Sequence, residues 1–179
     1  MSPEYGQKEK NISTIYSLAE KAFRNGADIV VAPEMATDHY YFDIEDVSDN
    51  IFIQDESKEF AALIELAGRY DGYICLGYPE KDPSRTFYNS AVVLGKDGVV
   101  AKHRKRTLPG WNSSGNLELP VFNSRFGKIG VLICADTNDG TNYLAELLYF
   151  QERDTDKRAI QLGVGFRKDG FSVRLAADL

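Results

Sequence analysis

The sequence predicts an α/β fold, in which helices alternate with strands and pack on a sheet. Two observations predict it. Apolar residues recur at the spacing of one helix face in separate segments, and short continuous apolar runs typical of buried strands follow them. This alternation is typical of a layered α/β domain. The chain has 179 residues, and domains usually hold about 100 to 200, so we expect a single domain over residues 1–179.

The first helix and strand are predicted near the start of the chain. Apolar residues on one helix face predict the helix; they are Ile12, Ile15, Tyr16, Ala19, Ala22 and Phe23. Asn11 is a candidate N-cap, and Gly26 is a candidate left-handed residue after the helix. Residues 29–32 then form an apolar run typical of a strand buried on both faces. Because Pro33 cannot donate to a sheet, the strand should end there and present Glu34 at its carboxyl end.

The middle of the chain predicts a loop, a helix and three strands. Residues 38–59 are acidic and aromatic without periodicity, which indicates a long loop. A second helix should follow and end near Gly72, because four apolar residues share one of its faces: Phe60, Leu63, Ile64 and Ala67. Residues 73–78 predict the next strand. Residues 90–94 and 99–103 flank a Lys-Asp-Gly turn and predict a hairpin.

The last part of the chain predicts a strand, a helix and a second hairpin. The apolar run at 128–134 predicts a strand that closes on Cys134. The spacing of Tyr and Leu residues within 143–148 indicates a third helix. Residues 159–166 and 171–176 surround another Lys-Asp-Gly turn and predict a hairpin.

Composition and charge exclude several classes of protein. With 43% hydrophobic residues, a mostly disordered chain is not expected. A net charge of −6 argues against a nucleic-acid partner, and no apolar run approaches the ~20 residues of a membrane span. Residues 1–11 are too polar for a signal peptide. Cys75 and Cys134 make neither a disulfide framework nor a zinc site, so we expect a cytoplasmic protein.

Cys134 is a candidate nucleophile. It lies at the junction of an apolar run with a turn, where a thiol can project from the edge of a sheet into a cleft. Backbone N–H groups of such a turn can stabilise a thiolate and a developing oxyanion. The alternative is a buried cysteine that only packs in the core. Packing is the expected role of Cys75, which lies inside its predicted strand.

Glu34 and Lys105 are candidate partners of that thiol. A carboxylate just beyond a buried strand lies where open α/β sheets bind ligands, and Glu34 there could serve as a general base. Lys105 follows a predicted strand, and its ammonium could neutralise the anion of a tetrahedral intermediate. The alternatives are a surface ion pair or helix-capping acid for Glu34, and a solvated basic run for Lys105, which has Lys102, Arg104 and Arg106 as neighbours.

Three ordered blocks together resemble the nitrilase, or carbon–nitrogen hydrolase, superfamily. Residues 27–34 (ADIVVAPE) are similar to its first block, and residues 103–108 (HRKRTL) to its lysine block, which usually reads Tyr-Arg-Lys-x-His-Leu. Residues 126–134 (FGKIGVLIC) resemble its nucleophile block, and residues 88–91 (YNSA) are also typical. The resemblance covers about residues 11–136, which leaves 137–179 as an atypical tail.

The resemblance implies a layered α-β-β-α sandwich and a Glu34–Lys105–Cys134 triad. By this resemblance Glu34 is the base, Cys134 attacks the carbon of a small amide or nitrile, and Lys105 stabilises the tetrahedral anion. A thioester would form and be hydrolysed, and neither a metal nor an organic cofactor is implied. Dimers are usual in the family, so a homo-oligomer is a candidate assembly.

The chain also departs from the family pattern. The usual first strand and the second half of the sandwich are not recognisable, which predicts an incomplete fold shortened at both ends. Asn112 and Glu118 are the nearest candidates for a second glutamate that many members carry. An alternative is therefore a degenerate, non-catalytic relative, a gene fragment or an interaction module. A further alternative is an unrelated α/β binding protein in which the three blocks coincide by chance.

Overall fold

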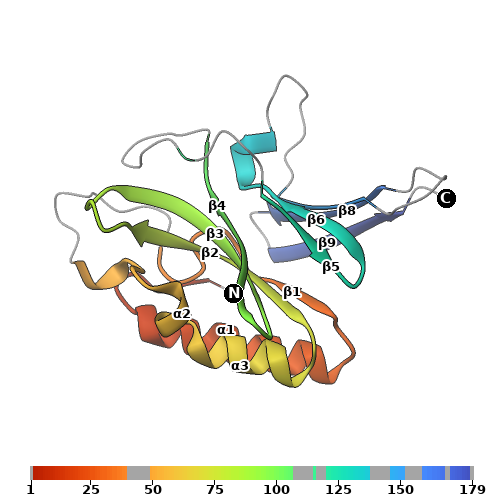
Figure 1. Ribbon diagram of the computed structural model, residues 1–179, viewed down its shortest axis with the longest axis horizontal. Coiled ribbons are helices and arrows are strands. Elements are labelled where there is room, and N and C mark those ends of the chain that lie inside the picture. The colour runs from red at the N-terminus through yellow and green to blue at the C-terminus, as the bar shows by residue number, and fades with distance from the viewer. Residues whose placement is uncertain are drawn as a thin grey trace.

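The computed structural model describes residues 2–39, 49–106, 115, 120–137, 146–151, 159–167 and 170–177, which form a helical layer and two β-sheets (Figure 1). The first sheet has the strand order β1-β2-β3-β4: β1 (Ile29–Val31), β2 (Tyr73–Lys81), β3 (Phe87–Gly95) and β4 (Gly98–Arg104). The second has the order β5-β6-β7-β8-β9: β5 (Val121–Ser124), β6 (Gly127–Val131), β7 (Glu146–Gln151), β8 (Ala159–Arg167) and β9 (Gly170–Ala177). The helices are α1 (Lys8–Arg24), η1 (Asp49–Ile51), α2 (Glu56–Glu59), α3 (Ala61–Arg69) and η2 (Cys134–Thr137).

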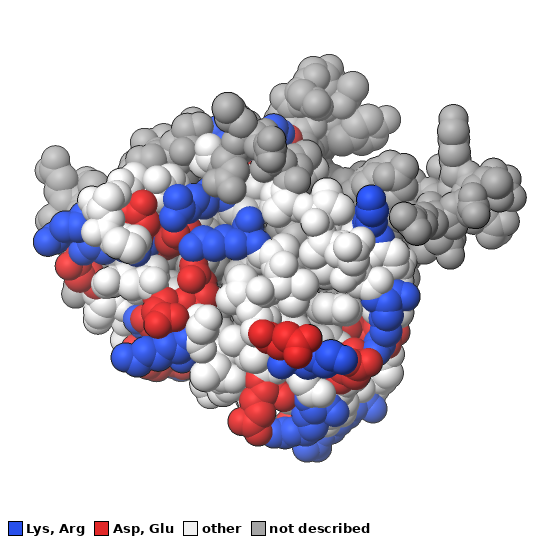
Figure 2. Space-filling model, in the orientation of Figure 1, with Lys and Arg blue, Asp and Glu red and all other residues white. Residues whose placement is uncertain are grey.

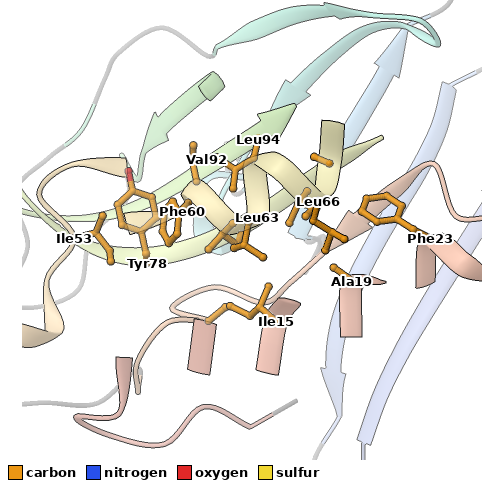
Figure 3. Close-up of a cluster of buried hydrophobic side chains, with 14 residues drawn as sticks. Ile15, Ala19, Phe23, Ile53, Phe60, Leu63, Leu66, Tyr78, Val92 and Leu94 are labelled. Atoms are coloured by element: carbon orange, nitrogen blue, oxygen red, sulfur yellow. The ribbon is translucent and has the colours of Figure 1, made fainter. Parts of the chain in front are cut away.

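Both long helices pack on one face of the first sheet, as Figure 1 shows. Their apolar stripes meet the sheet in one buried cluster, labelled in Figure 3: Ile15, Ala19, Phe23, Ile53, Phe60, Leu63, Leu66, Tyr78, Val92 and Leu94. The first two predicted helices are therefore confirmed. Gly26, with φ of +89°, is the left-handed residue predicted after α1. Asn11 is not the N-cap, because α1 begins three residues earlier and its N-cap is Gln7.

Strands β5 and β6 of the second sheet pack against the opposite face of the first. Side chains on that face of β2 and β3 pack against β5, β6 and the residues that follow β6, in a second cluster: Cys75, Ala91, Val93, Phe122, Ile129, Val131 and Ile133. Alternation along β2 explains how one strand serves both clusters, since Ile74 and Leu76 face the helices while Cys75 faces the second sheet. The described residues thus form α, β and β layers, which confirms the predicted α/β fold. Cys75 packs in the core, as predicted.

The strand pairing agrees with the two predicted hairpins. β1 runs parallel to β2, and β2, β3 and β4 are antiparallel, with the predicted hairpin turning at Gly98, whose φ is +110°. β8 and β9 form the second predicted hairpin. β1 differs from the expectation of full burial, since its three residues are only partly buried. The reason is that β1 lies at the end of the strand order and has one β-partner, β2, among the described residues.

Three other expectations are wrong in part. The segment 38–59 contains η1 and α2, and α2 begins where the side chain of Asp55 accepts a hydrogen bond from Lys58 N at 3.2 Å; residues 40–48 lie outside the described part. Residues 146–148 belong to β7 rather than to a helix, because pairing with β6 and β8 overrides their helical spacing; residues 143–145 lie outside the described part. The strand at 128–134 ends at Val131.

The surface carries charges of both signs side by side, as the face in Figure 2 shows. Many of them form exposed ion pairs, such as Lys10 with Glu4 and Arg69 with Glu65. Pairs of this kind contribute about 0 to 1 kcal/mol each to stability. None of the described helices has the length and apolar character needed to cross a membrane.

Candidate active site

Glu34 and Lys105 form a buried ion pair. Nζ of Lys105 lies 2.6 Å from Oε1 of Glu34, and the two side chains are 1% and 9% exposed, respectively. A buried ammonium is stable only beside a compensating charge, because removal from water penalises an isolated ion by several kcal/mol. The two residues are 71 positions apart in the sequence, so the fold brings together two of the three predicted site residues.

The turn that carries Glu34 lies directly against Gly77 of β2. Gly77 N donates to Pro33 O at 3.1 Å, and Gly77 O accepts from Ala36 N at 2.7 Å. A Cβ on Gly77 would come within 2.7 Å of both Glu34 Cα and Met35 N. Glycine is therefore required for the turn to approach β2 this closely. Met35, directly after Glu34, has φ of +55°, a strained conformation that persists where the surroundings fix it.

The backbone of Lys105 is fixed on both sides. Its N donates to Asn89 O at 2.8 Å, and its carbonyl accepts from Gly115 N at 3.0 Å. A Cβ on Gly115 would come within 2.0 Å of Arg104 O, so only glycine permits this approach. Lys105 directly follows β4, which agrees with its predicted place at the end of a strand.

Asn89 of β3 is a site residue that the sequence did not single out. Its side chain is buried and donates from Nδ2 to Oε1 of Glu34 at 2.6 Å. Among the described residues, Asn89 and Lys105 both donate to the same oxygen of the Glu34 carboxylate, Oε1. The signal available in the sequence was the segment 88–91 (YNSA), which leads into the strand expected at 90–94 and is typical of the family that the sequence resembles, but it pointed to no specific contact.

Cys134 is the first residue of η2 and is half-buried. Its φ of +46° lies in the left-handed region, which is uncommon for a residue with a side chain and often marks a functional turn. The sequence predicted Cys134 at the end of a strand, but β6 ends at Val131, so the cysteine belongs to the following turn. It also packs against the second apolar cluster. Both Cys75 and Cys134 are thiols rather than halves of a disulfide.

The turn of Cys134 is tied to the segment of Lys105 by Asp136. The carboxylate of Asp136 lies 2.7 Å from Nε2 of His103 and accepts from Arg106 N at 2.8 Å. Figure 1 shows η2, the short cyan helix, beside the end of β4. The segments that follow β1, β4 and β6 therefore meet at one end of the two sheets. The role of Cys134 in a triad stays a prediction.

The other basic residues near Lys105 are paired rather than solvated. Glu80, which is 3% exposed, accepts from Nη2 of Arg104 at 2.5 Å and from Nζ of Lys102 at 2.7 Å. Arg104 also stacks on the ring of Tyr88, with 3.8 Å between its Cζ and the ring centroid. Hydrogen bonding to Glu80 raises the pKa of Arg104 further above its ordinary value. The solvated alternative for this basic run is therefore wrong for Lys102, Arg104 and Lys105.

In the part of the chain that the structure describes, no group of three or more His, Cys, Asp or Glu side chains is arranged to hold a metal ion. The two candidates for a second glutamate, Asn112 and Glu118, lie outside the described residues.

Comparison with known proteins identifies a family for the chain. Residues 1–150 match the family model described as carbon-nitrogen hydrolase. The chain is 35% identical over 141 residues to a nitrilase of Pyrococcus abyssi, a match that covers 76% of this chain and 53% of the relative. It is 27% identical over 148 residues to the protein N-terminal amidase of Saccharomyces cerevisiae, covering 76% of this chain and 32% of that protein.

The fold has solved counterparts as well. An amidase from Nesterenkonia sp. superposes with a TM-score of 0.62 at 18% identity, covering 74% of this chain and 52% of the amidase. The helical layer and the two β-sheets, together with this structural match, identify an α/β protein of the nitrilase fold. The chain belongs to the carbon-nitrogen hydrolase family. It spans about half the length of the Pyrococcus nitrilase and a third of the yeast amidase.

Proposed function

We propose that this chain carries the catalytic residues of an amidase-like carbon–nitrogen hydrolase, with Cys134 as nucleophile, Glu34 as general base and Lys105 as oxyanion stabiliser. The observation that carries the proposal is the buried Glu34–Lys105 ion pair, held beside a turn whose first residue is Cys134. The relatives named as a nitrilase and an N-terminal amidase support a small amide, or a nitrile, as the substrate class.

The proposed reaction on an amide proceeds in two halves. Glu34 takes the proton of the Cys134 thiol as the sulfur bonds to the carbonyl carbon, whose oxygen becomes an anion. The ammonium of Lys105 stabilises that anion through its positive charge and an N–H donor. The carbon–nitrogen bond then breaks, Glu34 returns its proton to the leaving nitrogen, and an amine or ammonia departs. A thioester on Cys134 remains.

Water completes the second half of the proposed cycle. Glu34 accepts a proton from the water as its oxygen attacks the thioester carbon. The carbon–sulfur bond breaks, Glu34 returns that proton to the sulfur, and a carboxylic acid is released. Burial of the ion pair favours this chemistry, because charge stabilisation is stronger where water is excluded.

The test is release of ammonia from a panel of acetamide, propionamide, butyramide and the matching nitriles. We expect turnover of at least one amide and an acyl adduct on Cys134 detected by mass spectrometry. Cys134→Ala, Lys105→Met and Glu34→Gln should each lower kcat by about 1,000-fold or more, and Cys75→Ala serves as the matched cysteine control. Activity that survives Cys134→Ala, or an adduct on Cys75, would remove the nucleophile assignment. A folded protein without turnover or adduct would contradict the proposed activity.

The location and assembly of the protein are part of the same proposal. A nucleophilic thiol stays reduced in the cytoplasm, where disulfides are rare, and we place the protein there. We also propose a homo-oligomer, as implied by the family resemblance. Light scattering coupled to size exclusion gives the molar mass against the 20.0 kDa of one chain; a monomer across the working concentration range would contradict the assembly.

A further inference from the structure

One buried carboxylate contacts both the nucleophile turn and the lysine segment. The side chains of Asp136 and His103 are each 0% exposed, and Oδ2 of Asp136 lies 2.7 Å from Nε2 of His103. Oδ1 of the same carboxylate accepts from Arg106 N at 2.8 Å. His103 and Arg106 flank Lys105, so Asp136 is bonded to both sides of the residue proposed to stabilise the oxyanion.

The same carboxylate also holds the turn that bears the thiol. Ile133 N, which directly precedes Cys134, donates to Oδ2 of Asp136 at 3.3 Å, and Asp136 N donates to Ile133 O at 3.0 Å. These bonds close the turn around Cys134 at a φ of +46°. A strained conformation of this kind persists when several contacts over-determine it.

We propose that Asp136 and His103 are positioning residues that fix the distance and direction of the Cys134 thiol relative to the Glu34–Lys105 pair. This inference rests on the proposed function, because it assigns to the two residues the alignment of that site. A misplacement of about 1 Å can lower a rate about 100-fold, so the hydrogen bonds of Asp136 matter for rate beyond their contribution to stability. His103 stands at the position where the family's lysine block usually has Tyr.

The direction of the hydrogen bond defines which variants test the proposal. Both oxygens of Asp136 accept backbone hydrogen bonds, Oδ1 from Arg106 N and Oδ2 from Ile133 N, so we take Nε2 of His103 as the donor to Oδ2. Nδ1 of His103 is buried and has no hydrogen-bond partner among the described residues. A side chain that places one N–H at the position of Nε2 should therefore be sufficient. The amide of Gln can reach that position, whereas Asn is one bond shorter and Leu has no donor.

The experiment compares His103→Gln, His103→Asn and His103→Leu with the unsubstituted chain and with Lys128→Met, an exposed control on β6. Four quantities are measured: kcat and KM on the amide turned over in the panel, the rate at which iodoacetamide alkylates Cys134, and the thermal midpoint. We expect His103→Leu and His103→Asn to lower kcat by about 10- to 100-fold, with KM changed less than about threefold. The rate at which iodoacetamide alkylates Cys134 should fall along with kcat. His103→Gln should retain kcat within a few-fold.

A role in stability alone gives a different pattern. It would lower the thermal midpoint of His103→Leu while leaving kcat and alkylation of the folded protein unchanged, which would overturn the inference. Equal loss in His103→Gln and His103→Leu would overturn it as well. If the unsubstituted chain turned over no amide, the proposed function would fail, yet alkylation of Cys134 and hydrogen exchange of the Ile133 and Arg106 amides would still test the link. We expect both amides to exchange faster in His103→Leu and at the original rate in His103→Gln. Unchanged exchange in His103→Leu would overturn the inference.

Discussion

The side-chain amide of Asn89 donates to Oε1 of Glu34 at 2.6 Å, and the same oxygen accepts from Nζ of Lys105 at 2.6 Å. Asn89 also binds Lys105 through its backbone carbonyl, at 2.8 Å. One residue of β3 therefore fixes both members of the buried pair. Because Oε1 accepts from two donors among the described residues, we expect Oε2 to exchange the proton in the proposed mechanism.

Replacement of Asn89 by Ala should lower kcat by about 10- to 100-fold, because a carboxylate that loses a hydrogen bond can rotate out of alignment. KM should change little, since the proposed contact is with Glu34 and not with substrate. Steady-state kinetics on the amide turned over in the panel measures both, with Asn123→Ala on the exposed side of β5 as control. An unchanged kcat in Asn89→Ala would show that Lys105 alone orients the carboxylate.

Replacement of Gly77 by Ala should displace the turn of Glu34. The added Cβ meets backbone atoms of Glu34 and Met35 at 2.7 Å, and backbone cannot move aside as a flexible side chain can. We expect a loss of about 1 to 3 kcal/mol in the free energy of unfolding and a kcat loss of about tenfold or more in the folded fraction.

The matched control for Gly77 is Gly130→Ala on β6. An added Cβ there has its nearest neighbours at 3.8 Å, an ordinary contact distance. Urea unfolding and kinetics on both variants separate the local clash from the general effect of adding a methyl group to a strand. Equal behaviour of the two variants would contradict the close approach of Glu34 to β2.

Replacement of Glu80 by Gln should destabilise the first sheet. Glu80 is buried and neutralises Arg104 and Lys102, and it also accepts from Ser90 Oγ at 2.6 Å. Removing one partner of a buried ionic cluster leaves the others uncompensated, and because both cations are partly exposed we expect a loss of about 1 to 3 kcal/mol. Urea unfolding followed by circular dichroism measures it. Glu65→Gln, which removes an exposed pair with Arg69, should change stability by less than about 0.5 kcal/mol, and a similar loss in both variants would contradict the prediction.

The stability of the fold should fall in acid partly through Glu56. Burial raises the pKa of Glu56, but hydrogen bonds from Lys102 and Tyr78 and the charge of Lys102 together lower it more, so its pKa lies below the ordinary 4.5. A carboxyl whose pKa is lower in the folded than in the unfolded state adds stability above about pH 4.5 and loses it as the pH falls through the folded-state value.

Glu56→Gln should therefore be less stable than the unsubstituted chain at pH 7, by about 1 to 2 kcal/mol. The two proteins should converge in stability as the pH falls below 4.5. Urea unfolding at a series of pH values between about 7 and 3 measures this difference. A difference that stays constant over the whole series would contradict the role of the ionised carboxylate.

Local sequence determined the elements and where chemistry could lie within them. The apolar stripes of α1 and α3, the hairpin of β3 and β4, and the positions of Glu34 and Lys105 after strands all follow from spacing within a few residues, which is the range over which helix and strand periodicity acts. The three family blocks identified the carbon–nitrogen hydrolase family before any distance was known. A helix expected near 143–148 was wrong because sheet pairing, a non-local interaction, decided it.

Tertiary structure alone decided how the site is held together. The contact of Glu34 with Lys105 spans 71 positions, that of Asn89 with Glu34 spans 55, and that of His103 with Asp136 spans 33. No periodicity encodes such contacts, because they depend on which strand ends meet once two sheets and a helical layer have packed. The sequence therefore predicted the candidate residues Glu34 and Lys105. The packing of the layers decided which groups contact them: the side-chain amide of Asn89, which donates to Glu34, and the buried His103, which contacts Asp136.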